Sequence, residues 1–301
     1  MYISTTTGTF EKHGSHEAVL DMLKEAGFTA YDLAIYPDRV FPVTHEFCIG
    51  EKSLEELRSE RVDNPDHLID ANSARELRKY ADKIGLVCNQ THAPDPSQRV
   101  GDDRFNEFML PHLINSLEIS GILGAKVCVV HPCCGYTPEQ NAEFYKKLEP
   151  YARRAGVKIG VENMWDWDYE KDEAKPTSCS THENFKAHLD LLPSDVFCAC
   201  LDIGHSEMRG LNTSAVQMIK TLGNRIEALH IHDVDLHYDL HTLPYLAKVD
   251  YEPIWQALRE ASYKGDVTFE VGYNKKFPTE LYPACARLMA EVGKYIKSKI
   301  E

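Results

Sequence analysis

The chain has 301 residues, of which 43% are hydrophobic and 10% aromatic, so it can bury a large core and lies outside the disordered class. Its 33 Lys and Arg residues face 47 Asp and Glu residues, and this formal charge of −14 argues against nucleic acid as a partner. The first residues lack the basic and apolar regions of a signal peptide, and no long apolar run follows. The nine cysteines lie in apolar segments, as in proteins of reducing compartments. We therefore expect a cytoplasmic protein without membrane contact.

Eight short, β-rich runs recur along the chain and are predicted to be strands. In chain order they cover residues 2–7, 30–36, 86–92, 126–131, 158–164, 196–202, 226–232 and 266–271. Their nearly continuous hydrophobicity is typical of strands that are buried on both faces of a parallel sheet.

Amphipathic segments with helical spacing follow the predicted strands. They cover residues 15–27, 73–85, 107–124, 141–156, 181–192, 213–223, 252–265 and 283–299. Several begin at Ser, Thr or Asn and end at Gly, as helices with good caps do. Eight strand–helix units predict an α/β fold, a (β/α)8 TIM barrel that spans residues 1–301 as a single domain. A doubly wound open sheet is the alternative, although no G-x-G-x-x-G motif follows the first strand.

Two connections are longer than ordinary turns. Residues 37–70 follow the second predicted strand and residues 165–180 follow the fifth. Because long loops in compact domains usually serve as lids or interfaces, we expect functional insertions at both places. The sequence leaves open whether the chain forms a homo-oligomer.

The third to the eighth predicted strands all end in polar groups. These are His92, His131, Glu162 with Asn163, Asp202 with His205, His230 with His232 and Asp233, and Glu270. The carboxyl ends of barrel strands meet at one mouth, where several buried acids are costly unless a cation neutralises them. We therefore expect a shared divalent metal, and the mixture of carboxylates and imidazoles favours Mn²⁺, Zn²⁺, Co²⁺ or Fe²⁺ over Ca²⁺.

The segments GVENMW, CLDIGH, LHIHDVD and TFEVG carry a resemblance that runs over essentially the whole chain. They resemble the xylose isomerase-like TIM barrel superfamily of sugar phosphate isomerases and epimerases, which also includes ketose 3-epimerases, inosose dehydratase and endonuclease IV. The resemblance implies a central metal ion, with Mn²⁺ or Zn²⁺ favoured and Co²⁺, Fe²⁺ or Mg²⁺ as alternatives. Its ligands match Glu162, Asp202, His230 and Glu270. His205 is similar to a histidine that faces substrate in the epimerases.

The resemblance to endonuclease IV implies further metal ligands. His92 and His131 would bind a second ion together with Glu162, and a third ion would be bound by His205, Asp239 and His241. One departure is that the ketose epimerases share an arginine shortly after the histidine segment, whereas HDVDLHYDLH contains none.

Three hypotheses follow. The first is a metal-dependent isomerase or epimerase of a small sugar, sugar phosphate or polyol, in which Glu162 and Glu270 transfer a proton through an enediolate and His205 contacts the substrate. The second is a multi-metal phosphoester hydrolase, or a dehydratase or lyase of the same superfamily. The third is a non-catalytic barrel or a subunit that needs a partner chain. His232 is either a substrate contact or the partner of a nearby carboxylate, and Trp165 either lines the sugar pocket or packs in the core.

Overall fold

The structure is a computed structural model that describes residues 1–35, 70–272 and 277–301, and every structural statement below concerns these residues. Eight of its strands are parallel and coincide with the eight predicted runs. They are β1 (Ile3–Thr5), β2 (Ala30–Ala34), β3 (Val87–His92), β4 (Val127–Val130), β5 (Lys158–Glu162), β8 (Phe197–Asp202), β9 (Ile226–His230) and β10 (Val267–Phe269).

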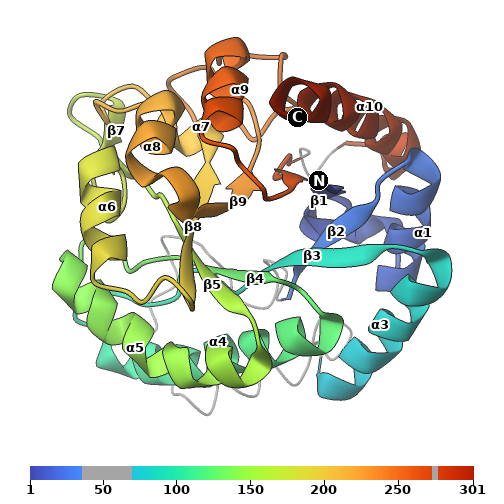
Figure 1. Cartoon of the computed structure of the whole chain (residues 1–301), viewed down its shortest axis with the longest axis horizontal. Helices are drawn as coiled ribbons and strands as arrows, with labels where there is room; N and C mark the ends of the chain where they lie inside the picture. The colour runs from blue at the N-terminus through green and yellow to red at the C-terminus, as the bar shows by residue number, and fades with distance from the viewer. Residues whose placement is uncertain (36–69, 273–276) are drawn as a thin grey trace.

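These strands close into a barrel. Six of them pair in the order β2-β3-β4-β5-β8-β9, and β1 pairs with β10. Parallel bridges from Thr6 to Asp32 and from Ile231 to Phe269 join the two sheets at both seams. The TIM barrel prediction is therefore confirmed, and the open sheet is wrong. In Figure 1 the helices form a ring around these strands.

The helical ring agrees with the predicted segments to within a few residues. It consists of α1 (His16–Ala26), α3 (Ala71–Ile84), α4 (Asp103–Leu123), α5 (Pro138–Ala155), α6 (His182–Asp190), α8 (Ala215–Leu222), α9 (Tyr251–Glu260) and α10 (Tyr282–Ile300). Helix α4 begins four residues earlier than predicted, because the Asp102 side chain caps it by accepting from the Phe105 N–H. Helix α9 stops earlier than predicted, and Ser262 then adopts a left-handed φ of 53°.

Short helices were not predicted. They are the one-turn helix α7 (Ile203–Ser206) and the 3-10 helices η1 (Thr7–His13), η4 (Gly223–Arg225) and η5 (Thr279–Leu281). Helix α7 matters for the site because it follows β8 directly and places His205 one turn beyond Asp202.

The predicted insertion at 165–180 contains an antiparallel hairpin made of β6 (Asp166–Asp168) and β7 (Glu173–Lys175). Trp167 of β6 and Trp165, just before this strand, pack against Ala174, Met208 and Leu211. The insertion predicted at 37–70 lies, except for its last residue, outside the described residues.

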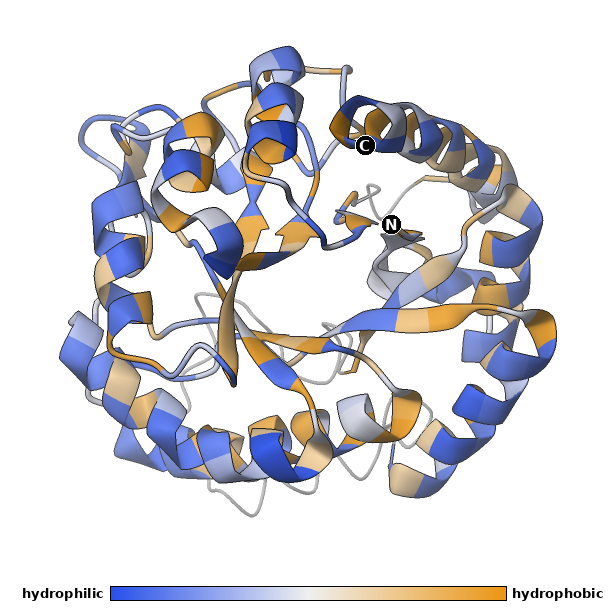
Figure 2. Cartoon of the chain, viewed as in Figure 1, coloured by the Kyte–Doolittle hydropathy of each residue, from blue (hydrophilic) through white to orange (hydrophobic). Residues whose placement is uncertain are grey.

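The hydrophobic core of the barrel contains more than one cluster of side chains. A large cluster fills the space between strands and helices, and a small cluster of Val127, Val129, Cys198, Cys200 and Ala228 forms separately from it. Figure 2 shows that β4 and β8 are mainly hydrophobic, whereas the ring helices mix hydrophilic and hydrophobic residues. All eight described cysteines are free thiols, and six of them are buried. None of the described helices has the length and apolar character needed to cross a bilayer.

Candidate metal centre

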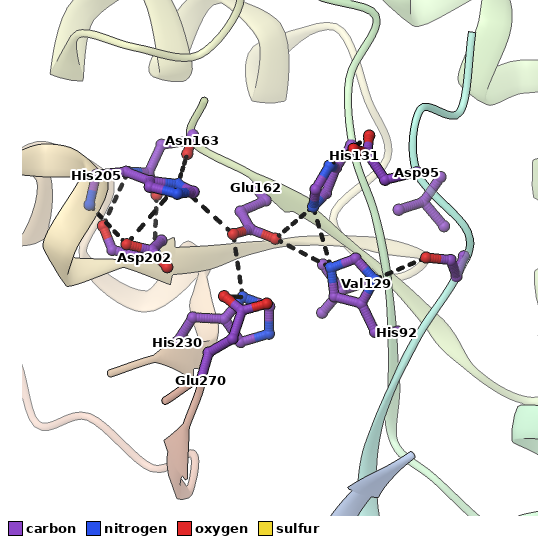
Figure 3. A network of polar contacts seen from close by, with 12 residues as sticks. His92, Asp95, Val129, His131, Glu162, Asn163, Asp202, His205, His230 and Glu270 are labelled. Carbon is purple, nitrogen blue, oxygen red and sulfur yellow. Dashed lines mark hydrogen bonds and ion pairs between the residues drawn. The ribbon is translucent and has the colours of Figure 1, made fainter. Parts of the chain in front are cut away.

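The residues predicted to bind the central metal come together at one end of the barrel (Figure 3). Glu162, Asp202 and His230 are the last residues of β5, β8 and β9, and Glu270 follows β10 directly. One ligand atom from each of the four lies within 4.8 Å of the others. Parallel strands of a closed barrel end at a common face, which is why residues more than one hundred positions apart meet here.

Glu162 lies at the centre of the site and is only 1% exposed. Its Oε1 is 3.0 Å from Nδ1 of His230. Its Oε2 lies 3.1 Å from Nε2 of His131 and 3.6 Å from Nε2 of His92, with hydrogen-bond geometry to neither. Burial opposes ionisation, but His230 and His131 hold the pKa of Glu162 well below its usual range. Glu162 is therefore a carboxylate that can serve two neighbouring ligand sets.

His92 and His131 form a second ligand set with Glu162. The Nδ1 of His92 lies 2.7 Å from the Ala93 carbonyl oxygen, and Nδ1 of His131 lies 2.8 Å from Oδ1 of Asp95. Both Nε2 atoms therefore face each other, at 3.0 Å. If both Nδ1 atoms carry the proton, two lone pairs oppose each other, and a proton or a cation between them is required. The pair is thus suited to a metal ion.

The third predicted set also converges. The Nε2 atoms of His205 and His241 lie 3.2 Å and 3.0 Å from Oδ2 of Asp239. Their Nδ1 atoms contact the carbonyl oxygens of Asn163 and Glu270, at 2.9 Å and 2.8 Å. As in the second set, an oxygen outside the ligand set contacts Nδ1 of each ring, so that Nε2 faces the other ligands. This is the usual arrangement around histidine metal ligands.

His232 joins the third set, which the sequence did not predict. The side chain is fully buried, its Nε2 lies 3.0 Å from both carboxylate oxygens of Asp202, and its ring stacks on His241 at 3.9 Å. These contacts favour the role of carboxylate partner over that of substrate contact. Because Asp202 belongs to the central set, His232 connects that set to the third one.

Local hydrogen bonds hold Asp202 and His205 in place. The Asn163 side chain accepts from the Asp202 N–H at 2.8 Å and donates to the Asp202 carbonyl oxygen at 2.9 Å, which ties β5 to β8. Oδ1 of Asp202 in turn accepts from the His205 N–H at 2.7 Å and caps α7. The segments GVEN and CLDIGH therefore depend on each other, because Asn163 of the first hydrogen-bonds the backbone of Asp202 in the second.

Aromatic side chains border the third set. Trp165 lies edge-on to His205 at 6.4 Å, and Trp167 stacks on Tyr238 at 5.6 Å. The β6–β7 hairpin thus packs against the loop that carries Asp239. Whether Trp165 also contacts a sugar stays a prediction.

Sequence reasoning missed Asp95, which orients His131. An acidic residue three positions beyond a strand that ends in histidine was an available signal, but its partner could not be read from the sequence.

The side chains present fit divalent metal ions. Carboxylate oxygens and imidazole nitrogens are suitable ligands, and they converge within 4.8 Å in each set. Glu162 Oε2 and Asp239 Oδ1 are buried and have no hydrogen-bond partner. Buried polar atoms seldom stay unpaired, so these two oxygens are suited to a cation.

We expect metal to stabilise the protein more as the pH rises. Although burial disfavours the charged rings, Asp95 and Glu162 raise the pKa of His131 to about 10, and Asp239 raises that of His241 to about 10, from 6.5. A raised folded-state pKa stabilises the metal-free protein fully below pH 6.5, and this contribution is lost as the pH rises towards 10. Metal ions displace these protons, so their binding strengthens over the same range.

The measurement is the melting temperature with chelator and with Mn²⁺, between pH 6.5 and 8.5. The difference between the melting temperatures with Mn²⁺ and with chelator should increase with pH, and it should increase less in His131→Gln. A constant or narrowing difference in the wild type would contradict this linkage.

Comparison with known proteins places this chain in a family. The model of the xylose isomerase-like TIM barrel family matches residues 20–292. An uncharacterized protein of Sinorhizobium fredii, y4fM, is 31% identical over 77 residues, which make up 26% of this chain and 24% of that protein.

Several solved structures are similar along nearly the whole chain. A D-tagatose 3-epimerase-like protein has 16% identity and a TM-score of 0.69, with 100% of both chains covered. The 3-keto-D-glucoside 4-epimerase of E. coli has 15% identity and a TM-score of 0.66, over 97% of this chain and 99% of that one. D-Psicose 3-epimerase of Clostridium cellulolyticum, solved with D-tagatose, has 13% identity and a TM-score of 0.70, over 98% and 99%. Such low identities establish the fold alone. Because the family model spans most of the sequence, this chain belongs to the xylose isomerase-like TIM barrel family.

Proposed function

We propose that the protein is a metal-dependent isomerase or epimerase of a sugar, sugar phosphate or related polyol. The observation that carries the proposal is that two carboxylates from different strands converge on one imidazole nitrogen. Oε1 of Glu162 and Oε2 of Glu270 lie 3.0 Å and 3.1 Å from Nδ1 of His230. The sugar epimerases among the similar structures support the same reaction class.

The two carboxylates would transfer the proton. A divalent ion held by Glu162, Asp202, His230 and Glu270 would supply Lewis acidity that polarises the substrate carbonyl and stabilises an enediolate. Burial opposes ionisation, but His230 lowers the pKa of both Glu162 and Glu270, so both are carboxylates. One takes the carbon-bound proton, and the other returns one.

His205 would orient the substrate. Its Nδ1 lies 2.9 Å from the Asn163 carbonyl oxygen, so Nε2 faces the mouth. Burial disfavours the charged ring, but Asp202 and Asp239 raise the pKa of His205 well above its usual value. Nε2 of His205 lies 3.2 Å from Oδ2 of Asp239, and with only the central ion bound a substrate hydroxyl would take the place of that carboxylate as its hydrogen-bond partner. Trp165 beside it would cover an apolar sugar face.

A second candidate is a multi-metal phosphoester hydrolase. The observation that favours it is the pair of additional ligand sets around His92 and His131 and around Asp239. Ions in such sets can bind the attacking and the leaving oxygens of a phosphoester together.

One preparation tests both candidates. We expect protein purified without chelator to contain at least the central divalent ion, Mn²⁺ or Zn²⁺, in each chain, and to catalyse deuterium exchange at carbon 3 of a ketohexose in D₂O. D-Tagatose, D-allulose and D-fructose form the first substrate panel, and proton NMR reports the exchange. Chelator-treated protein is the control, and restored metal should restore exchange.

Two or three ions per chain, with hydrolysis of a phosphodiester substrate and no exchange, would favour the hydrolase. We further propose that residues 1–301 form one domain that works in the cytoplasm on a small-molecule substrate. Size-exclusion chromatography of the same sample determines whether the chain self-associates.

A further inference from the structure

Asp32 is a buried carboxylate that the proposed chemistry does not use. It lies in β2, within the otherwise apolar segment AYDLA, and is 0% exposed. Its Oδ2 accepts a hydrogen bond from Nε2 of Gln90 at 3.3 Å, and its Oδ1 has no partner. Buried carboxylates are normally paired or fully hydrogen-bonded, so this position needs an explanation.

The imidazole nearest to Asp32 belongs to the metal-ligand candidate His230. Nε2 of His230 lies 3.7 Å from Oδ2 of Asp32, and like Oδ1 of Asp32 it has no hydrogen-bond partner. The ring turns Nδ1 towards Glu162 and Glu270, so Nε2 faces β2. A shift of about half an ångström would bring these two groups into hydrogen-bond distance.

The other imidazoles of the three ligand sets show what is missing at His230. In four of them one ring nitrogen lies 2.7–2.9 Å from an oxygen outside the cluster, and the opposite nitrogen faces the ligands. These four are His92, His131, His205 and His241. Metal-binding histidines generally donate their second N–H to such an oxygen. At His230 the corresponding oxygen belongs to Asp32.

The backbone also points to a positioned group. Tyr31 pairs with Cys88, but Asp32 pairs with Gln90, so Asn89 is an extra residue in β3. This bulge lets both amides reach buried partners, since Asn89 donates to Oγ1 of Thr268 at 3.2 Å while Gln90 donates to Asp32. Bulges next to active sites often re-aim a side chain in this way.

We propose that Asp32 is a positioning residue for the metal centre: its carboxylate accepts the Nε2 proton of His230, which leaves the Nδ1 lone pair for the divalent ion. Asp32 itself touches neither the ion nor the substrate. The inference rests on the proposed metal centre at Glu162, Asp202, His230 and Glu270.

The test is the affinity of the central ion in Asp32→Asn and Asp32→Glu, measured by competition with a chromophoric chelator using Zn²⁺ and Mn²⁺. The central ion is identified as the one whose binding is lost in Glu270→Gln. We expect Asp32→Asn to lower the affinity for the central ion about 10- to 100-fold, because the loss of a hydrogen-bond partner of a metal-binding histidine typically has this effect. Asp32→Glu keeps the charge and should stay within a few-fold of the wild type.

The melting temperatures of the metal-free proteins distinguish a role of Asp32 in positioning His230 from a role in stabilising the fold. Metal-free Asp32→Asn should melt at or above the wild-type temperature, because it loses a poorly compensated buried charge. Ser4→Ala is the matched control, since Ser4 donates to Oγ1 of Thr268 at 2.9 Å inside the same barrel. It should leave metal affinity unchanged.

Unchanged affinity in Asp32→Asn, equal loss in Asp32→Glu, or metal-free Asp32→Asn that melts well below the wild type would each overturn the inference. Wild-type protein that binds no ion sensitive to Glu270→Gln would overturn the metal centre itself.

Discussion

Replacing Glu162 or Glu270 by Gln is expected to lower turnover at least about 10³-fold while the barrel stays folded. The amide has nearly the same size but cannot accept a proton from carbon, and it no longer balances the charge of an ion. Both side chains contact Nδ1 of His230, so either replacement disturbs the central set. Initial rates on the substrate found by deuterium exchange, together with circular dichroism, measure the two parts of this prediction.

The two variants should differ in metal content. Glu162 also lies 3.1 Å from His131, so Glu162→Gln should weaken the second ligand set as well, whereas Glu270→Gln should spare it. Glu291→Gln is a matched control, because Glu291 is an exposed residue of α10 that pairs with Lys294. Near wild-type turnover in both active-site variants would show that proton transfer does not depend on these carboxylates.

Gly204→Ala is expected to destabilise the protein by about 3 kcal/mol and to weaken metal binding, because the added methyl group overpacks a buried site. A Cβ on Gly204 would lie 2.1 Å from Cε1 of His232. His232 cannot move aside without cost, since it stacks on His241 and contacts both carboxylate oxygens of Asp202. Urea unfolding of the metal-free protein and chelator competition measure the two effects.

Gly8→Ala is the control for this substitution. Its added Cβ would lie 3.5 Å from the Ala34 side chain and 3.6 Å from that of Thr6, which is ordinary contact. It should leave both the unfolding free energy and the metal affinity close to wild type. Equal effects of the two substitutions would mean that His232 has no fixed position beside Asp202.

Much of the site could be predicted because barrel topology turns local pattern into position. A polar residue that ends a buried strand must face the common mouth, so His92, Glu162 and Asp202 could be placed near one another before any distance was known. The strands themselves were predictable for a related reason: buried parallel strands are short apolar runs, and six of the runs here have a polar group at or just beyond their end.

The tertiary structure alone decided how these groups are paired. The oxygens that hold Nδ1 of His92 and His241 are backbone carbonyls, which leave no mark in residue type. The contact of His232 with Asp202 joins the segment after β9 to β8, and the approach of Asp32 to His230 joins β2 to β9. Sequence pattern determines burial and strand direction because these depend on neighbours in the chain. Which nitrogen of a histidine faces an ion depends on partners distant in sequence, and only the closed barrel brings them within reach.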